Sequence, residues 1–145
     1  MKYLDLLGSN LKMDILCDLF ETYDTDVIYQ YDRVHEGASD EFHAHVSDLG
    51  LQFIFDEQQE LRTLFIEQVE INTFNPFHTD TRIPSFHSKA EAINYAEQNE
   101  AQITEGQVDF MGELKDWIRI DYDIYSLHYE FIDSTLKMIT LQHKT

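Results

Sequence analysis

The sequence pattern of one β-hairpin occurs twice in the chain, over residues 51–66 and 127–141. Both carry leucine or aromatic side chains at every second position, namely Leu51, Phe53 and Phe55 in the first stretch and Leu127, Tyr129 and Phe131 in the second. Each member of the first set precedes its counterpart by 76 positions. A repeat of this length is one supersecondary unit used twice. The sequence therefore predicts that both halves of the chain fold in the same way.

The same offset superimposes two expected helices, over residues 11–23 and 89–99. Their apolar faces have the spacing of one side of a helix and consist of Leu16, Leu19 and Phe20 in the first and Ala92, Tyr95 and Ala96 in the second. Ser9 or Asn10 is expected to cap the first helix through a side-chain oxygen. Ser88 and Glu91 form the Ser-x-x-Glu pattern of a capping box at the start of the second.

Strand signals follow each helix. Residues 27–33 alternate, residues 35–48 read as a polar loop, and residues 107–111, 117–122 and 127–131 are strand-like, closed by residues 136–141. Short connections join antiparallel neighbours. The predicted class is α+β, with two tandem helix-plus-three-strand repeats that form antiparallel sheet and pack their helices on one face. One domain is expected over 1–145, with pseudo-repeats at about 1–70 and 84–145 and a connecting segment at about 67–87.

The charge balance narrows the choice of partners. Twenty-eight acidic and ten basic residues give a formal net charge of −18. Such a surface repels phosphate backbones and anionic lipids, so nucleic acid and membrane are not expected partners. It would instead steer a basic protein toward the chain. The single cysteine, Cys17, and the lack of a signal-peptide pattern predict a cytoplasmic location.

Strand phase indicates which sheet face meets that partner. Over residues 117–124, Ile118 and Ile120 share one face, whereas Trp117 and Arg119 share the other. The apolar face is expected to pack on the helices and the polar face to stay open. The candidate partner-binding residues are Trp117, Arg119, Asp121, Asp123, His128 and Glu130. Tryptophan and arginine are enriched in interface hot spots, although Trp117 packing under the connecting segment is the alternative.

Catalytic signatures are absent from the sequence. It has no nucleophile elbow, phosphate-cradling glycine loop or dinucleotide fingerprint. His43 and His45 would share one face of an extended strand, with His35 and Glu36 nearby. They suggest a small metal-binding enzyme as an alternative, but no third ligand has a diagnostic spacing. We therefore expect no enzyme and no cofactor.

The repeated unit resembles known proteins. Residues 88–93, 117–119, 127–131 and 136–141 are similar to the helix-plus-sheet repeat of the β-lactamase inhibitor protein and of small lipoproteins of the outer-membrane assembly machinery. The order of residues 6–8, 49–56, 83–84 and 117–119 also resembles small bacterial immunity proteins of polymorphic or contact-dependent toxins. The chain departs from that pattern between Ser88 and Glu105, where it lacks a Leu-Gly-x-Pro turn.

The resemblance implies a function. A cytoplasmic immunity protein would neutralise a basic, nuclease-like toxin domain by blocking its active site or an exosite. A stand-alone binding or mobile-cassette protein with another partner is the alternative that the sequence leaves open. The oligomeric state is not indicated by the sequence.

Overall fold

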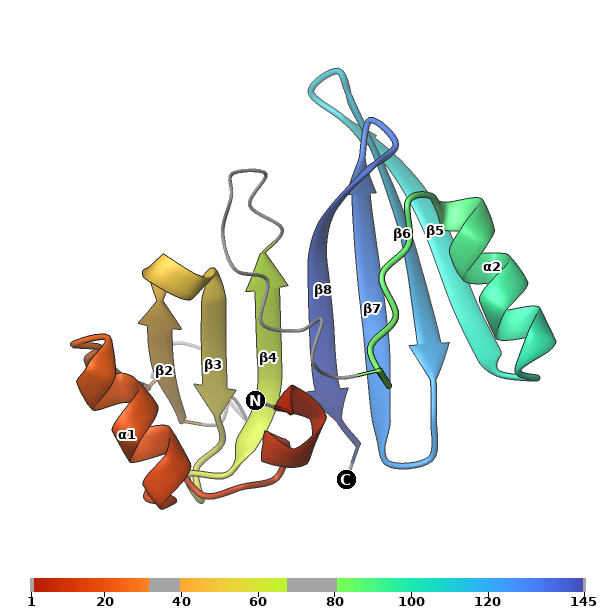
Figure 1. Cartoon of the computed structure of the whole chain (residues 1–145). Helices are drawn as coiled ribbons and strands as arrows, with labels where there is room; N and C mark the ends of the chain where they lie inside the picture. The colour runs from red at the N-terminus through yellow and green to blue at the C-terminus, as the bar shows by residue number, and fades with distance from the viewer. Residues whose placement is uncertain (1, 32–39, 68–80, 145) are drawn as a thin grey trace.

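The structure, a computed structural model, describes residues 2–31, 40–67 and 81–144 (Figure 1). The first half begins with a 3₁₀ turn, Tyr3–Leu6, and helix α1, Asp14–Thr22. Four strands and a second 3₁₀ turn follow: β1 Val27–Gln30, β2 Glu41–Val46, η2 Ser47–Leu49, β3 Leu51–Phe55 and β4 Leu61–Glu67. The second half contains α2 Lys89–Gln98, β5 Gln102–Phe110, β6 Glu113–Asp121, β7 Tyr125–Ile132 and β8 Thr135–His143.

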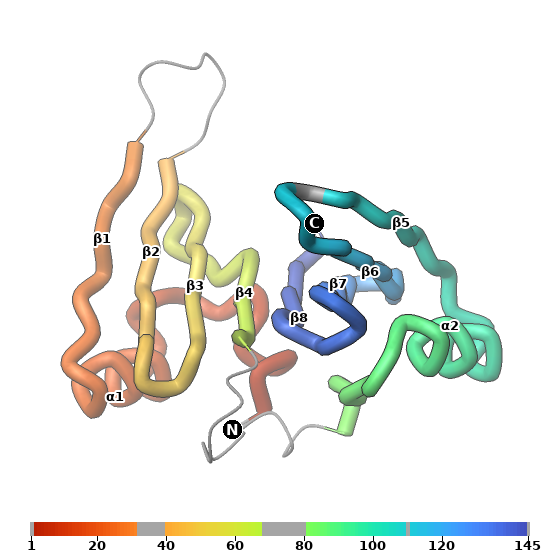
Figure 2. Tube along the Cα trace, turned by 90° about the horizontal axis from the view of Figure 1, so that it is seen from above, coloured from red at the N-terminus to blue at the C-terminus, as the bar shows by residue number. Residues whose placement is uncertain are grey.

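All eight strands belong to one antiparallel sheet in the order β1-β2-β3-β4-β8-β7-β6-β5. Each half contributes an up-and-down meander of four strands. The meanders join where β4 pairs with β8, from Thr63 opposite Gln142 to Glu67 opposite Met138. The last strands of the two halves therefore lie side by side at the centre, and β1 and β5 form the outer edges (Figure 2). The predicted α+β class is confirmed in outline, with sheet as the dominant element.

Each helix is followed by four strands, so the prediction of three was wrong. The error in the first half lies at β2, because the sequence pattern predicts a polar loop over residues 35–48. Phe42, Ala44 and Val46 alternate along β2 toward the core side, but alanine is a weak strand former and histidines separate these residues. Pairing with β1 on one side and β3 on the other fixes the segment as a strand.

Both helices cover the same face of the sheet, and the core lies between helices and strands (Figure 2). Phe20 of α1 packs edge-on against Phe53 and Phe55 of β3, with ring centroids 5.2 and 6.3 Å apart. Helix α2 fully buries the small side chains of Ala92 and Ala96, and its Ile93 and Tyr95 are partly buried against the core. Neither α1 nor α2 lies on the opposite face of the sheet.

The two predictions of helix capping have different outcomes. Ser88 Oγ accepts a hydrogen bond from the Glu91 N–H at 3.2 Å, and Glu91 Oε2 accepts one from the His87 N–H, so the capping box is confirmed. The prediction for α1 was wrong, because Met13 is the N-cap residue and makes no side-chain cap. Asn10 accepts a hydrogen bond from the Lys12 N–H and pairs with Glu60 instead.

The described end of the connecting segment, residues 81–87, packs against the core of the second half. Ile83 and Phe86 are buried. The Phe86 ring packs against Tyr129, and the Tyr129 hydroxyl donates a hydrogen bond of 2.7 Å to the Pro84 carbonyl. Phe74 and Phe77 of the connecting segment lie outside the described residues.

Candidate functional site

The open face of the second half holds five of the six predicted partner-binding residues. Ile118 and Ile120 of β6 are fully buried toward the helices, which places Trp117, Arg119 and Asp121 on the opposite face. The register sets Trp117 opposite Glu130 and Arg119 opposite His128 on β7. Paired residues of neighbouring strands point to the same side of a sheet, so these side chains form one half-buried surface.

Asp123 lies apart from that surface. Asp123 and Ile124 form the two-residue tip of the β6–β7 turn, which the Tyr122 N–H closes by donating to the Tyr125 carbonyl. Strand alternation therefore stops before Asp123. Strict alternation from Ile118 and Ile120 would place the Ile124 side chain on the apolar face, but it is 66% exposed for the same reason.

Trp117 is held flat on the open face. A Cβ atom on Gly106, its partner on β5, would lie 2.6 Å from the indole ring, so the ring occupies space that only glycine leaves free. The other flank of the indole stacks on His128, with centroids 5.3 Å apart and planes 27° from parallel. Because residues 81–87 lie on the helix-covered side, Trp117 does not pack beneath that described part of the connecting segment.

The carboxylates of the open face already have basic partners. Glu130 pairs with Lys115 at 2.7 Å, and Asp121 pairs with both Arg119 at 3.2 Å and Lys144 at 3.1 Å. These pairs leave the surface around Trp117 mixed in charge. The strand residues of this surface therefore do not form an anionic patch of unpaired carboxylates.

The excess negative charge lies elsewhere on the chain. Helix α1 exposes Asp14, Asp18 and Glu21, spaced by four and three residues so that they follow one side of the helix. These three carboxylates form no salt bridge with a described basic residue. The excess negative charge therefore lies outside the surface around Trp117.

His128 provides a pH-dependent prediction. Its burial lowers the imidazole pKa, and Arg119 and Lys115 act in the same direction against the opposing charge of Glu130. Because the folded state then binds a proton less readily than the unfolded chain, stability is expected to be complete above the usual imidazole pKa of about 6.5 and to fall as the pH drops below it.

Urea unfolding at neutral pH and at about pH 5 measures this loss. The His128→Gln variant should lose less stability than the parent chain between the two pH values. NMR titration of His128 in the folded protein reports the pKa directly, and a value at or above that of a free imidazole would contradict the interpretation.

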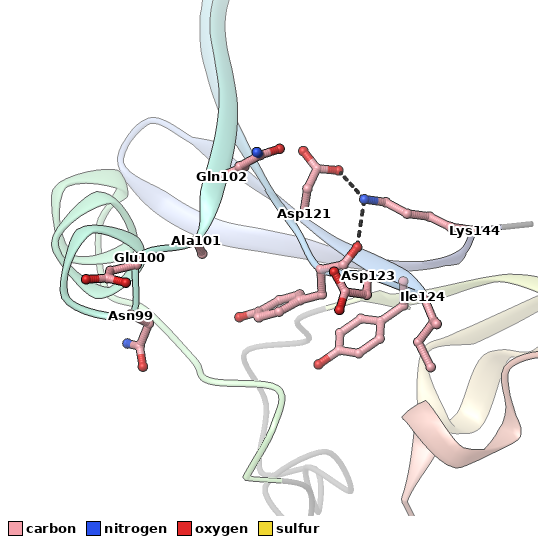
Figure 3. Close-up of a pocket in the computed structure, with 10 residues that line it drawn as sticks. Asn99, Glu100, Ala101, Gln102, Asp121, Asp123, Ile124 and Lys144 are labelled. Atoms are coloured by element: carbon pink, nitrogen blue, oxygen red, sulfur yellow. Dashed lines mark hydrogen bonds and ion pairs between the residues drawn. The ribbon is translucent and has the colours of Figure 1, made fainter.

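An open groove adjoins the lower end of this face (Figure 3). Its volume is about 690 Å³, and three chain segments form it: the end of α2 with the start of β5 (residues 99–102), the β6–β7 turn (121–125) and Lys144. Asp123 and Lys144 point into the region between these segments (Figure 3). Sequence reasoning missed the groove because its residues share no motif and meet only in the folded chain.

The two histidines proposed as metal ligands lie on β2. His43 and His45 share the open face, as expected for an extended segment, and His43 Nε2 lies 2.7 Å from Glu41 Oε2. Within residues 2–31, 40–67 and 81–144, no group of three or more histidine, cysteine or acidic residues could hold a metal ion. His35 and Glu36 lie outside these ranges.

Two further findings bear on function. Among the described residues, no helix has the length and apolar character that crossing a membrane requires. No protein-family model matches the chain, and comparisons with curated proteins and with solved structures found no match either, so the resemblance to immunity proteins remains a prediction.

Proposed function

We propose that this chain is a non-enzymatic binding protein that docks a basic protein domain on the open face of its sheet. The most specific form of the proposal is a cytoplasmic immunity protein that neutralises a basic, nuclease-like toxin. The observation that carries it is the uncovered surface around Trp117. Both helices pack on the other side of the sheet, which leaves this surface open to a partner.

The composition of the surface supports docking. Trp117 is rigid, because Gly106 and His128 flank its ring, and a preordered aromatic side chain loses little entropy on binding. Lys115, Glu130 and Arg119 surround it with charged groups. An aromatic centre within a polar rim is the usual anatomy of a protein interface.

The charge acts at longer range. A net charge of −18 accelerates association with a cationic domain, whichever part of the surface makes the final contact. A toxin that cleaves nucleic acid needs basic residues to bind phosphates. Docking beside those residues would block the toxin's active site or an exosite, and association should slow as salt increases.

We further propose that the two halves arose as copies of one helix-and-meander unit. Three local features recur 76 positions apart and support this: the positive φ of Asp24 and Glu100 after each helix, the register shift at Phe55 and at Phe131, and the helix-end hydrogen bonds from Thr25 to Phe20 and from Ala101 to Ala96. A measured structure whose halves superpose only at another offset would contradict the duplication.

The function is tested with any basic protein domain whose gene lies next to the gene of this chain. The full chain should bind that domain, protect cells from it, and show a slower association rate at high salt. Trp117→Ala is expected to weaken binding at least about tenfold, as for a hot-spot residue. Tyr23→Ala truncates an aromatic residue near the C-terminal end of α1 and should leave the affinity within about twofold.

Two measurements distinguish the effects of Trp117→Ala and Tyr23→Ala. Calorimetric titration gives both dissociation constants, and unfolding midpoints verify that each variant is folded. Binding that is indifferent to Trp117 would move the interface away from the open face. Failure of the chain to bind or protect against the neighbouring domain would remove the immunity proposal.

A further inference from the structure

We infer that the groove beside the β6–β7 turn is a subsite for an arginine side chain of the partner (Figure 3). The inference rests on the proposed function only in taking the partner to be a basic protein. It adds the chemical group that the groove recognises. Shape, charge and the aromatic wall support it separately.

The groove is built on a fixed turn. The Lys144 N–H donates a hydrogen bond of 2.8 Å to the Ile124 carbonyl, and Lys144 Nζ donates another of 2.8 Å to the Tyr122 carbonyl. Together with the bond that closes the turn between Tyr122 and Tyr125, these contacts tie the turn to the end of β8. A preordered rim reduces the entropy lost when a ligand binds.

The lining favours a cation. It contains three carboxylates, those of Glu100, Asp121 and Asp123, and one ammonium group, that of Lys144. Asp121 is already paired with Lys144 and Arg119. Glu100 and Asp123 are exposed and form no salt bridge with any described basic residue, so they remain available to a positively charged group.

The aromatic wall favours arginine over lysine. The Tyr122 and Tyr125 rings stack with centroids 4.8 Å apart, and both residues line the groove beside the exposed Ile124. A planar, weakly hydrated guanidinium stacks on an aromatic face and donates two parallel hydrogen bonds to a carboxylate, whereas a compact ammonium does neither as well. The aliphatic stem of the ligand can cover Ile124.

The groove is continuous with the docking surface. Asp121 lines the groove and also belongs to the open face, where its neighbour along β6 is Arg119. A partner seated over Trp117 can therefore extend an arginine past the end of β6 to Asp123. The groove would then add specificity at the rim of the interface, because an unpaired carboxylate there selects for a cation.

The test uses the isotopically labelled full chain and a small probe, N-acetyl-arginine amide, followed by NMR. We expect millimolar binding with backbone shifts confined to residues 99–102 and 121–125. N-acetyl-citrulline amide has nearly the same shape without the charge and should bind at least about fivefold more weakly. N-acetyl-lysine amide should fall between the two.

Two variants make the test specific to the groove. Asp123→Asn is expected to weaken arginine binding about three- to fivefold. Asp109→Asn removes the same charge from an exposed position on β5 and should leave the affinity unchanged. Spectra that overlay outside the groove verify that both variants fold like the parent chain.

Three results would overturn the inference: equal binding of the citrulline probe, equal weakening by both variants, or shifts spread along the exposed carboxylates of α1. None of them depends on a protein partner. A chain that binds a basic domain through Trp117 but ignores the arginine probe would keep the proposed function and lose the subsite.

Discussion

Replacing Phe53 by alanine is expected to lower the free energy of unfolding by about 3–5 kcal/mol. Phe53 is fully buried at the centre of β3, and its ring meets Phe20 of α1 edge-on at 5.2 Å. Truncation removes apolar area from the core and leaves a cavity beneath α1, which buries larger side chains than α2 does. Urea unfolding followed by circular dichroism measures the loss.

Phe65→Ala is the matched control. Phe65 lies on β4, pairs with Thr140 of β8 and points to the open face, where it is half-buried. Its truncation should cost about 1 kcal/mol, because little area is buried there and no cavity forms. Equal losses in the two variants would mean that the face assignment of β3 and β4 is wrong.

Gly106→Ala is expected to displace Trp117 and to destabilise the fold by about 1–3 kcal/mol. The added Cβ would approach the middle of the indole ring to 2.6 Å, so the ring must leave its place over β5 and lose the stack on His128. Trp117 is the single tryptophan of the chain, so its fluorescence reports the movement alone. A red-shifted emission is expected as the ring enters water.

The Trp117→Ala background isolates the cause. Without the indole, the same Gly106→Ala change should be neutral or should stabilise the strand by about 0.5–1 kcal/mol, since glycine is unfavourable in strand interiors. Opposite signs in the two backgrounds give a large coupling energy in a double-mutant cycle. Equal destabilisation in both backgrounds would show that Gly106 serves the backbone and not the ring.

Local pattern predicted the elements whose partners are close in sequence. The two hairpins follow from alternation at Leu51, Phe53 and Phe55 and at the equivalent positions after Leu127, all of which are buried. The start of α2 follows from Ser88 and Glu91, because a capping box closes within four residues. The phase of β6 likewise assigned Ile118 and Ile120 to the core.

The errors arose where distant segments decide the outcome. Strand β2 has a weak pattern of its own and is fixed by β1 and β3 on either side. Strand alternation predicts Asp123 on the open face, but a turn interrupts the alternation, and Asp123 lies apart from that surface. Asp121 and Glu130 were predicted from the sequence as partner-binding residues, yet within the fold they form salt bridges with Lys144 and Lys115.

The sequence by itself determined the hairpins, the helix faces and the side of the sheet on which Trp117 lies, since periodicity acts over a few residues. Only the tertiary structure decided that β4 pairs with β8 to make one sheet, that Gly106 makes room for the indole, and that three segments enclose the groove at Asp123. These features depend on contacts between residues far apart in the chain. Such contacts are selected by packing and charge in the folded molecule, and no local pattern records them.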